Sequence, residues 1–180
     1  MCWSYRVKYQ WMAMLLFAPM AYSEVPPSFA QSLFDSPPTR VMIHNPESTE
    51  GSRNRTTITV VVPEDAGNSL QEIVLRQLPN LDEWDWGHLE PRVYLSDYSL
   101  RGKGTSGLAS AVVSESEEVL YIKLTPAIQP GQTVNVVFRG FNPQSSIYQW
   151  STELLAAGED PVRYVGPTLR LNVYEQDPYR

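Results

Sequence analysis

Apolar and polar residues alternate along much of the chain in short runs. Between Thr56 and Val62, the apolar residues Ile58 and Val60 alternate with threonines 57 and 59. Successive side chains of a β-strand point to opposite faces of a sheet, so this period of two predicts a strand. The runs that we expect to form strands are 41–43, 56–62, 73–78, 93–95, 108–113, 119–124, 133–138, 148–154 and 169–173.

Turn-forming residues separate these runs about every ten residues. Pro130-Gly131 is the strongest of these signals, and the acidic segment 114–118 joins two runs into a predicted hairpin. No long helical pattern interrupts the series. Evenly spaced short strands therefore predict an all-β fold, an immunoglobulin-like β-sandwich of about eight or nine short antiparallel strands. An eight-stranded barrel is the alternative, and the pattern does not separate the two.

The first 23 residues have the pattern of a secretory signal peptide. Arg6 and Lys8 precede an apolar run of about eleven residues, and the small residues Ala21 and Ser23 stand where a signal peptidase cleaves. The run is shorter than the ~20 residues of a membrane-spanning helix; an uncleaved anchor or a buried helix is the alternative. We expect cleavage after Ser23 and a periplasmic or extracellular protein with no stable membrane span.

Composition divides the rest of the chain into three segments. Residues 24–39 contain four prolines, which fix φ and lack a backbone donor, so we expect an extended Pro-rich lead-in. The β-sandwich domain is expected over 40–176, followed by a short tail at 177–180. Cys2 is the only cysteine and lies within the signal peptide, so the mature domain is expected to form no disulfide.

Charge restricts the class of partner. The chain has 14 Lys and Arg against 20 Asp and Glu, which gives a formal net charge of −6. The basic residues form no run along the sequence that would bind a phosphate backbone. We therefore expect no nucleic-acid partner.

Several motifs resemble a known family. They are Thr59–Gly67, Leu70–Gln77, Pro126–Val136, Asn142-Pro143, Ile147–Trp150, Ala157–Glu159 and Val165–Leu171. Over roughly residues 40–173 the sequence resembles an exported cyanobacterial family known as domain of unknown function 2808. The resemblance implies an exported β-rich domain and assigns no activity. The segment 82–90, which is rich in tryptophan and acidic residues, departs from the family pattern.

Two tryptophans are the candidate ligand-binding residues. Trp84 and Trp86 point to the same side of an extended segment, and Tyr94 follows them. Exposed indoles beside acidic hydrogen-bond acceptors can stack on sugar rings, so these three residues form a candidate carbohydrate-binding surface. Large aromatic side chains are buried on average. The alternative is therefore a lid that folds over the open end of the sandwich.

The same segment contains candidate metal ligands. Asp82, Glu83 and Asp85 offer carboxylate oxygens, which suit Ca²⁺. The ordered Asp-x-Asp-x-Asp-Gly loop is missing, so a solvated acidic loop is the alternative. The only histidines, His44 and His88, are far apart in the sequence and have no cysteine partner, a pattern that does not predict a zinc site.

A glycine motif at 102–107 matches G-x-G-x-x-G. In a dinucleotide site this motif stands between a strand and a helix, whose N-terminus faces the pyrophosphate. Here a strand-like run follows it, at 108–113. The context predicts a hairpin loop, and we expect no cofactor.

Together these features predict an exported, non-catalytic β-sandwich of the cell envelope that binds or scaffolds a partner, either an envelope protein or a polysaccharide. A carbohydrate-binding module that uses Trp84 and Trp86 is the first alternative. An envelope hydrolase is the second. It is disfavoured because no serine lies in a G-x-S-x-G motif and two isolated histidines do not predict a catalytic triad.

Overall fold

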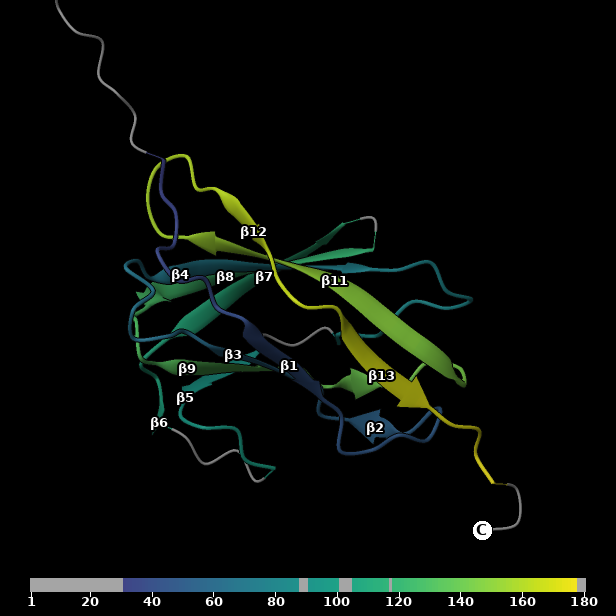
Figure 1. Cartoon of the computed structure of the whole chain (residues 1–180). Helices are drawn as coiled ribbons and strands as arrows, with labels where there is room; N and C mark the ends of the chain where they lie inside the picture. Colours follow the sequence, from purple (N-terminus) through teal and green to yellow (C-terminus); the bar gives the residue numbers. More distant parts are fainter. Residues whose placement is uncertain (1–30, 88–90, 101–104, 117, 178–180) are drawn as a thin grey trace, which may run out of the picture.

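The computed structural model describes residues 31–87, 91–100, 105–116 and 118–177. Every regular element in these ranges is a β-strand, and the strands form two facing sheets with a short ribbon at one end (Figure 1). Within the same ranges, no helix is long and apolar enough to cross a bilayer. The predicted signal peptide, with its cleavage position Ser23, lies outside the described residues.

The five-stranded sheet has the strand order β1-β3-β9-β5-β6. Its strands are β1 (Arg40–His44), β3 (Thr57–Val61), β9 (Thr133–Val137), β5 (Arg92–Leu95) and β6 (Thr105–Ser106). The antiparallel register pairs Ile58 of β3 with Ile43 of β1 and with Val136 of β9. Because the apolar positions of neighbouring strands fall opposite one another, they form one continuous apolar face.

The six-stranded sheet has the order β12-β11-β4-β8-β7, and β13 also pairs with β11. Its strands are β4 (Leu70–Gln77), β7 (Ser110–Ser116), β8 (Val119–Ile128), β11 (Ser146–Ala156), β12 (Arg163–Val165) and β13 (Leu169–Val173). Strand β4 lies at the middle, where Leu75 pairs with Thr152 of β11 and with Leu120 of β8. Strands β7 and β8 pair over seven residues, which confirms the predicted hairpin.

A two-stranded ribbon joins β2 (Arg53–Asn54) to β10 (Gly140–Phe141). It lies at the end of the sandwich near β13, and the loop before β2 is held there because the amide of Glu50 donates to the carbonyl of Tyr174 at 2.9 Å (Figure 1). Strands of two residues are too short to show a period of two. The ribbon was therefore not predicted from the sequence.

The hydrophobic core lies between the two sheets. Ile58 and Val60 of β3 are fully buried and belong to one cluster with Ile73 of β4 and Ile122 of β8. Burying one such side chain contributes roughly 1.5–3 kcal/mol relative to leaving it exposed. The two facing antiparallel sheets confirm the predicted sandwich and exclude the barrel alternative.

Five aromatic rings fill the end of the core next to the ribbon. Trp84 lies edge-on to Tyr148 and to Trp150, with ring centroids 5.3 and 5.4 Å apart. Trp86 makes the same kind of contact with Phe138 at 5.1 Å and lies 5.8 Å from Trp150. Edge-to-face pairs of this kind contribute about 0.5–1.5 kcal/mol each beyond the area that they bury. The segment 84–86 therefore closes the sandwich as the lid alternative predicts.

Burial of Tyr148 makes the fold sensitive to alkaline pH. The Tyr148 hydroxyl donates to the carbonyl of Gln144 at 2.8 Å. Burial, with a contribution from the carboxylates of Asp82 and Glu50, raises the pKa of Tyr148 to about 12. An unfolded tyrosine ionises near pH ~10, so the stability gained by keeping this phenol neutral is intact below that pH. We expect that stability to fall as the pH rises from about 10 to about 12.

Denaturant titrations at a series of pH values test this expectation. The wild-type protein should lose stability progressively over that interval, while the Tyr148→Phe variant, which has no phenol to ionise, should lose less. If the variant declines as steeply as the wild type, the loss does not come from Tyr148.

Residues 31–39 pack against the sandwich, which corrects the prediction of an unpacked lead-in for this part of it. Phe34 is buried in the core cluster, and the amide of Asp35 donates to the carbonyl of Ala66 at 2.9 Å. Ser32 forms a parallel bridge with Pro161. The segment has no regular structure and therefore no periodic pattern in its sequence. For that reason the burial of its one core side chain, Phe34, was not predicted. The preceding residues, 24–30, lie outside the described part.

The outer face of the five-stranded sheet is also covered. Thr59 and Asn135 point away from the core, yet both are fully buried. The Thr59 hydroxyl donates to Asn135 Oδ1 at 2.7 Å, and Asn135 Nδ2 donates to the carbonyl of Ser96, also at 2.7 Å. The segment that follows β5 therefore lies over this part of the face, and its Ser96 carbonyl satisfies the Asn135 amide.

Candidate functional site

A hollow of about 520 Å³ lies on the β2–β10 ribbon. Its lining residues are Pro46, Glu47, Arg53, Asn54, Arg55, Arg139, Gly140 and Phe141. Three of the eight are arginines, although the whole chain has a net charge of −6. Two smaller hollows, of about 280 and 370 Å³, have no arginine in their lining. The ribbon therefore carries a local concentration of positive charge on an acidic protein.

None of these arginines forms an ion pair with a carboxylate among the described residues. The salt bridge found among them joins Arg163 to Glu153 on the six-stranded sheet. The guanidinium carbon of Arg53 lies 5.6 Å from the centroid of the Phe141 ring. Arg55 Nη2 donates to the carbonyl of Leu100 at 3.2 Å. A guanidinium has five N–H donors in a planar fork, so these contacts leave donors for a carboxylate, sulfate or phosphate group.

Glu47 is the one carboxylate in the lining. The amide of Thr49 donates to Glu47 Oε1 at 3.1 Å. The hydrogen bonds from Thr49 lower the pKa of Glu47, so its carboxylate is charged at neutral pH. The hollow thus combines three cations with one fixed acceptor.

The wall that carries Glu47 and Arg53 is held by the buried side chain of Asn142. Asn142 Nδ2 donates to the carbonyls of Glu47 and Thr49, at 2.9 and 2.7 Å. Its Oδ1 accepts hydrogen bonds from the side-chain amides of Asn54 and Asn45. One amide group therefore fixes the loop 45–54 at four points. Asn142 is part of the Asn-Pro corner in the family resemblance, and its structural role explains why an amide is placed there.

The opposite wall is braced by the segment 82–87. Asp85 Oδ2 accepts a hydrogen bond from the amide of Phe141 at 2.9 Å, and Asp85 Oδ1 accepts one from Gly87 at 2.7 Å. The backbones approach so closely that a Cβ on Gly140 would lie 2.2 Å from the carbonyl oxygen of Asp85. Gly87 has a φ of +78°, which favours glycine. This contact fixes the backbone from which Arg139 and Phe141 project.

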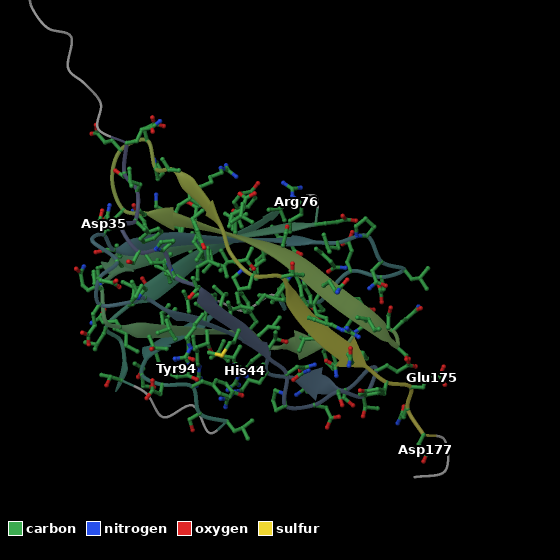
Figure 2. The ribbon with its side chains drawn as sticks, in the orientation of Figure 1. Asp35, His44, Arg76, Tyr94, Glu175 and Asp177 are labelled. Carbon is green, nitrogen blue, oxygen red and sulfur yellow. The ribbon has the colours of Figure 1, made fainter. Side chains whose placement is uncertain are left out.

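Arg55 connects the hollow with the covered face of the five-stranded sheet. Arg55 donates to the carbonyl of Leu100, which lies two residues after Tyr98 in the sequence. The ring of Tyr98 stacks on that of His44, with centroids 3.5 Å apart. Burial lowers the pKa of His44. Burial also raises the pKa of Tyr94 and Tyr98, and the positive charge of Arg55 opposes that rise. Figure 2 shows His44 and Tyr94 on the side of this sheet that faces away from the six-stranded sheet.

The family described as "Protein of unknown function (DUF2808)" matches residues 31–173. The chain belongs to this family. The matched range includes both sheets and all residues that line the hollow, so the hollow is part of the DUF2808 domain. No curated protein sequence matches this DUF2808 chain.

Solved structures resemble the DUF2808 domain in fold. An uncharacterized protein from Nocardia farcinica with an immunoglobulin-like fold is 15% identical, with a TM-score of 0.45, over 74% of this chain and 96% of that one. BslA, a bacterial hydrophobin, is 12% identical, with a TM-score of 0.44, over 79% and 99%. A collagen-binding domain of a Staphylococcus aureus adhesin is 8% identical, with a TM-score of 0.38, over 74% and 96%. At these identities the similarity concerns the fold alone.

The predicted carbohydrate-binding residues lie in the interior of the DUF2808 domain. Trp84, Trp86 and Tyr94 are 2%, 5% and 4% exposed. The two indoles pack among the rings of the core, whereas Tyr94 lies on the outer face of the five-stranded sheet. The three residues do not share a surface, and neither indole offers an exposed face to a sugar. This corrects the carbohydrate-binding prediction for Trp84, Trp86 and Tyr94.

The predicted calcium ligands do not converge. Asp82 Oδ1 accepts a hydrogen bond from the amide of Glu83 at 2.9 Å, and Asp82 Oδ2 accepts one from Gln144 at 3.2 Å. Asp85 likewise uses both oxygens within the DUF2808 domain. Among the residues that the structure describes, no group of three His, Cys, Asp or Glu residues is placed to hold a metal ion. The structure therefore corrects the metal prediction for Asp82, Glu83 and Asp85, because the two aspartates serve to shape the loop.

Two other sequence features of the DUF2808 chain fall partly outside the described residues. His88 and the first three residues of the glycine motif, 102–104, are among them. Of the remainder, Thr105 and Ser106 form β6, which pairs with Leu95 and Tyr94 of β5. These two residues therefore form a strand inside the motif, where the sequence predicts a loop, and the loop prediction for 102–104 lies outside the described residues.

The arginines of the hollow were not predicted from the sequence. Arg53 and Arg55 are two residues apart, as are Arg139 and Phe141, so each pair points to one side of an extended segment. That spacing is the signal that was available. It gives no indication that the two segments, more than eighty residues apart, pair as β2 and β10.

Proposed function

We propose that this DUF2808 protein is an exported, non-catalytic binding module of the cell envelope, and that its three-arginine hollow holds an anionic group of an envelope partner. The observation that carries the proposal is the gathering of Arg53, Arg55 and Arg139 in one hollow, with no described carboxylate paired to them. Guanidinium groups bind planar or tetrahedral oxyanions through paired hydrogen bonds. On an acidic protein, such a cluster favours a role in recognition over general solubility.

The residue types around the hollow support binding rather than catalysis. Among the described residues that line it, none is a serine, cysteine or histidine. Catalysis by a hydroxyl, thiol or imidazole nucleophile needs one of these residues with a base within hydrogen-bond reach, and catalysis by a pair of carboxylates needs a second one beside Glu47, which the described lining does not supply. Export is supported by the N-terminal sequence, in which a positively charged start, a short apolar run and small residues end at Ser23.

Binding to acidic polymers tests the proposal. We expect the domain to bind dextran sulfate or polygalacturonate at low salt and to bind neutral dextran far more weakly. A triple variant with Arg53→Gln, Arg55→Gln and Arg139→Gln should lose affinity by about tenfold or more, since hydrogen bonds to charged groups contribute about 1.5–3 kcal/mol each. Isothermal titration calorimetry measures these affinities, and they should fall as sodium chloride is added.

A matched variant separates the site from the net charge. Arg40→Gln, Arg76→Gln and Arg170→Gln remove the same three charges from exposed positions outside the hollow. This control should change the affinity for either polymer by less than about threefold. Equal losses in the two triple variants would show that the acidic polymers respond to overall charge alone, and the proposed site would be wrong.

A further inference from the structure

The hollow carries groups that a simple anion does not need. Sulfate, phosphate or polyphosphate requires only cations and N–H donors, which the three arginines supply. Two other lining residues, Phe141 and Glu47, do not suit such a ligand. Their chemistry identifies the kind of molecule that carries the anionic group.

Phe141 provides an apolar surface in the hollow. Its side chain is 49% exposed, although phenylalanine side chains are among those most often buried in folded proteins. The Arg53 guanidinium lies against the ring, with 5.6 Å between the guanidinium carbon and the ring centroid. A cation and an exposed ring therefore stand next to each other. A pyranose ring has an apolar C–H face that packs on the negative face of an aromatic ring, so Phe141 suits a sugar.

Glu47 provides a charged hydrogen-bond acceptor. Its Oε1 accepts from the amide of Thr49, and a carboxylate has about four lone-pair positions in all, so it can accept from a ligand as well. A ligand that offers nothing but negative charge is repelled by this carboxylate. The hydroxyl groups of a sugar, in contrast, are donors that it can accept.

An acidic peptide fits the ribbon less well. Peptides commonly add to an open sheet edge through their backbone. Here the amide of Phe141 in β10 already donates to Asp85, and the backbone of Asp85 lies against Gly140. The amide of Asn142, just after β10, donates to the carbonyl of Ser52 at 2.9 Å. Strand β10 therefore offers an acidic peptide no open backbone edge.

We infer that the anionic group in the hollow is the carboxylate of a uronic acid, so that the domain binds an acidic polysaccharide; this inference rests on the proposed function. The arginines bind the carboxylate, Phe141 packs against the sugar ring and Glu47 accepts from its hydroxyl groups. The volume of about 520 Å³ lies within the ~300–1,000 Å³ that is usual for small-molecule sites, and so suits a short stretch of saccharide better than a lone anion.

Three trimeric probes test the inference on the full domain. Trigalacturonate carries three carboxylates on sugar rings, end-capped triglutamate carries the same charge on a peptide, and trigalactose carries the rings without charge. We expect the wild-type protein to bind trigalacturonate about tenfold more tightly than either of the others. Calorimetry at one fixed low salt concentration gives the three affinities.

Two variants ask whether the sugar is recognised. Phe141→Ala should weaken trigalacturonate binding about fivefold and triglutamate binding by less than about twofold, since it removes the ring but keeps all three arginines. Glu47→Gln removes a negative charge, so it should strengthen triglutamate binding and lower the ratio of the two affinities by about threefold. Neither side chain is part of the core cluster, so we expect both variants to fold. The near-ultraviolet circular dichroism of the buried tryptophans verifies this.

The outcomes distinguish the two levels of proposal. If trigalacturonate and triglutamate bind equally and both variants change them in parallel, the sugar inference is overturned while the anion-binding function stands. If neither charged trimer nor either acidic polymer binds the wild-type domain, the proposed function fails as well.

Discussion

Replacing Trp84 with alanine is expected to lower the free energy of unfolding by about 4 kcal/mol, which is the usual scale for removing a large ring from a core. The Trp84 side chain is 2% exposed, and its ring centroid lies 5.3 Å from that of Tyr148 and 5.4 Å from that of Trp150. Its indole Nε1 has no hydrogen-bond partner among the described residues, so the loss comes from packing. Since a domain is typically stable by only about 5–15 kcal/mol, this variant should unfold at much lower denaturant concentration.

Two control variants, one with a smaller ring at position 84 and one without an exposed ring, test whether the loss comes from the buried indole. Trp84→Phe keeps a ring in the same place and should cost about half as much. Phe141→Ala removes an exposed ring and should cost less than about 1 kcal/mol. The prediction would be wrong if the Trp84→Ala protein kept wild-type stability. If that protein also lost an affinity for neutral sugars, the result would support the carbohydrate-binding alternative, which the buried position of Trp84 contradicts.

Replacing Asn142 with alanine is the second change with a large expected effect, a loss of about 2–4 kcal/mol of stability together with weaker anion binding. The substitution removes four hydrogen bonds that hold the loop, each worth about 0.5–1.5 kcal/mol net, and leaves the side-chain amide of Asn45 without its partner. Unsatisfied buried polar groups cost about 1–3 kcal/mol each, and part of that cost is recovered where water enters. The loop 45–54 then no longer holds Arg53 in place.

An isosteric substitution tests whether the hydrogen bonds of the Asn142 amide, and not the volume of its side chain, stabilise the loop. Asn142→Asp keeps the size of the side chain but directs a carboxylate oxygen at the two carbonyls that the amide now serves, so it should destabilise at least as much as alanine. The exposed Asn172→Ala serves as the control and should change stability by less than about 0.5 kcal/mol. Urea unfolding followed by tryptophan fluorescence measures all three. Equal stability of the Asn142 and Asn172 variants would mean that the loop is held by other contacts.

The strands were predictable because the core enforces the period of two. Ile58 and Val60 occupy one face of β3, and a shift of one residue would turn them towards the outer face, so the pattern and the fold agree. The covering of the opposite face was not predictable. Thr59 and Asn135 are buried there by a segment that follows β5 without regular structure, and a loop of this kind leaves no periodic signal.

The segment 82–87 shows why residue type alone was a poor guide to the site. Tryptophans beside aspartates are consistent with a sugar-binding groove, with a metal loop and with a structural lid. The decision depends on what lies beneath the segment, namely Tyr148 and Trp150 of β11, about sixty residues further along the chain. The hollow itself depends on the pairing of β2 with β10, which only the three-dimensional structure supplies.

The brace formed by the segment 82–87 has a consequence for how a ligand is received. Its indoles are packed among the core rings and Asp85 holds the backbone of Phe141, so the edge of the hollow cannot shift without disturbing the interior. On the other side, Asn142 ties the loop 45–54 at four points. We therefore expect the proposed site to be rigid. A ligand of that site would bind with an affinity set by contact chemistry and not by the entropy lost when a flexible loop becomes ordered.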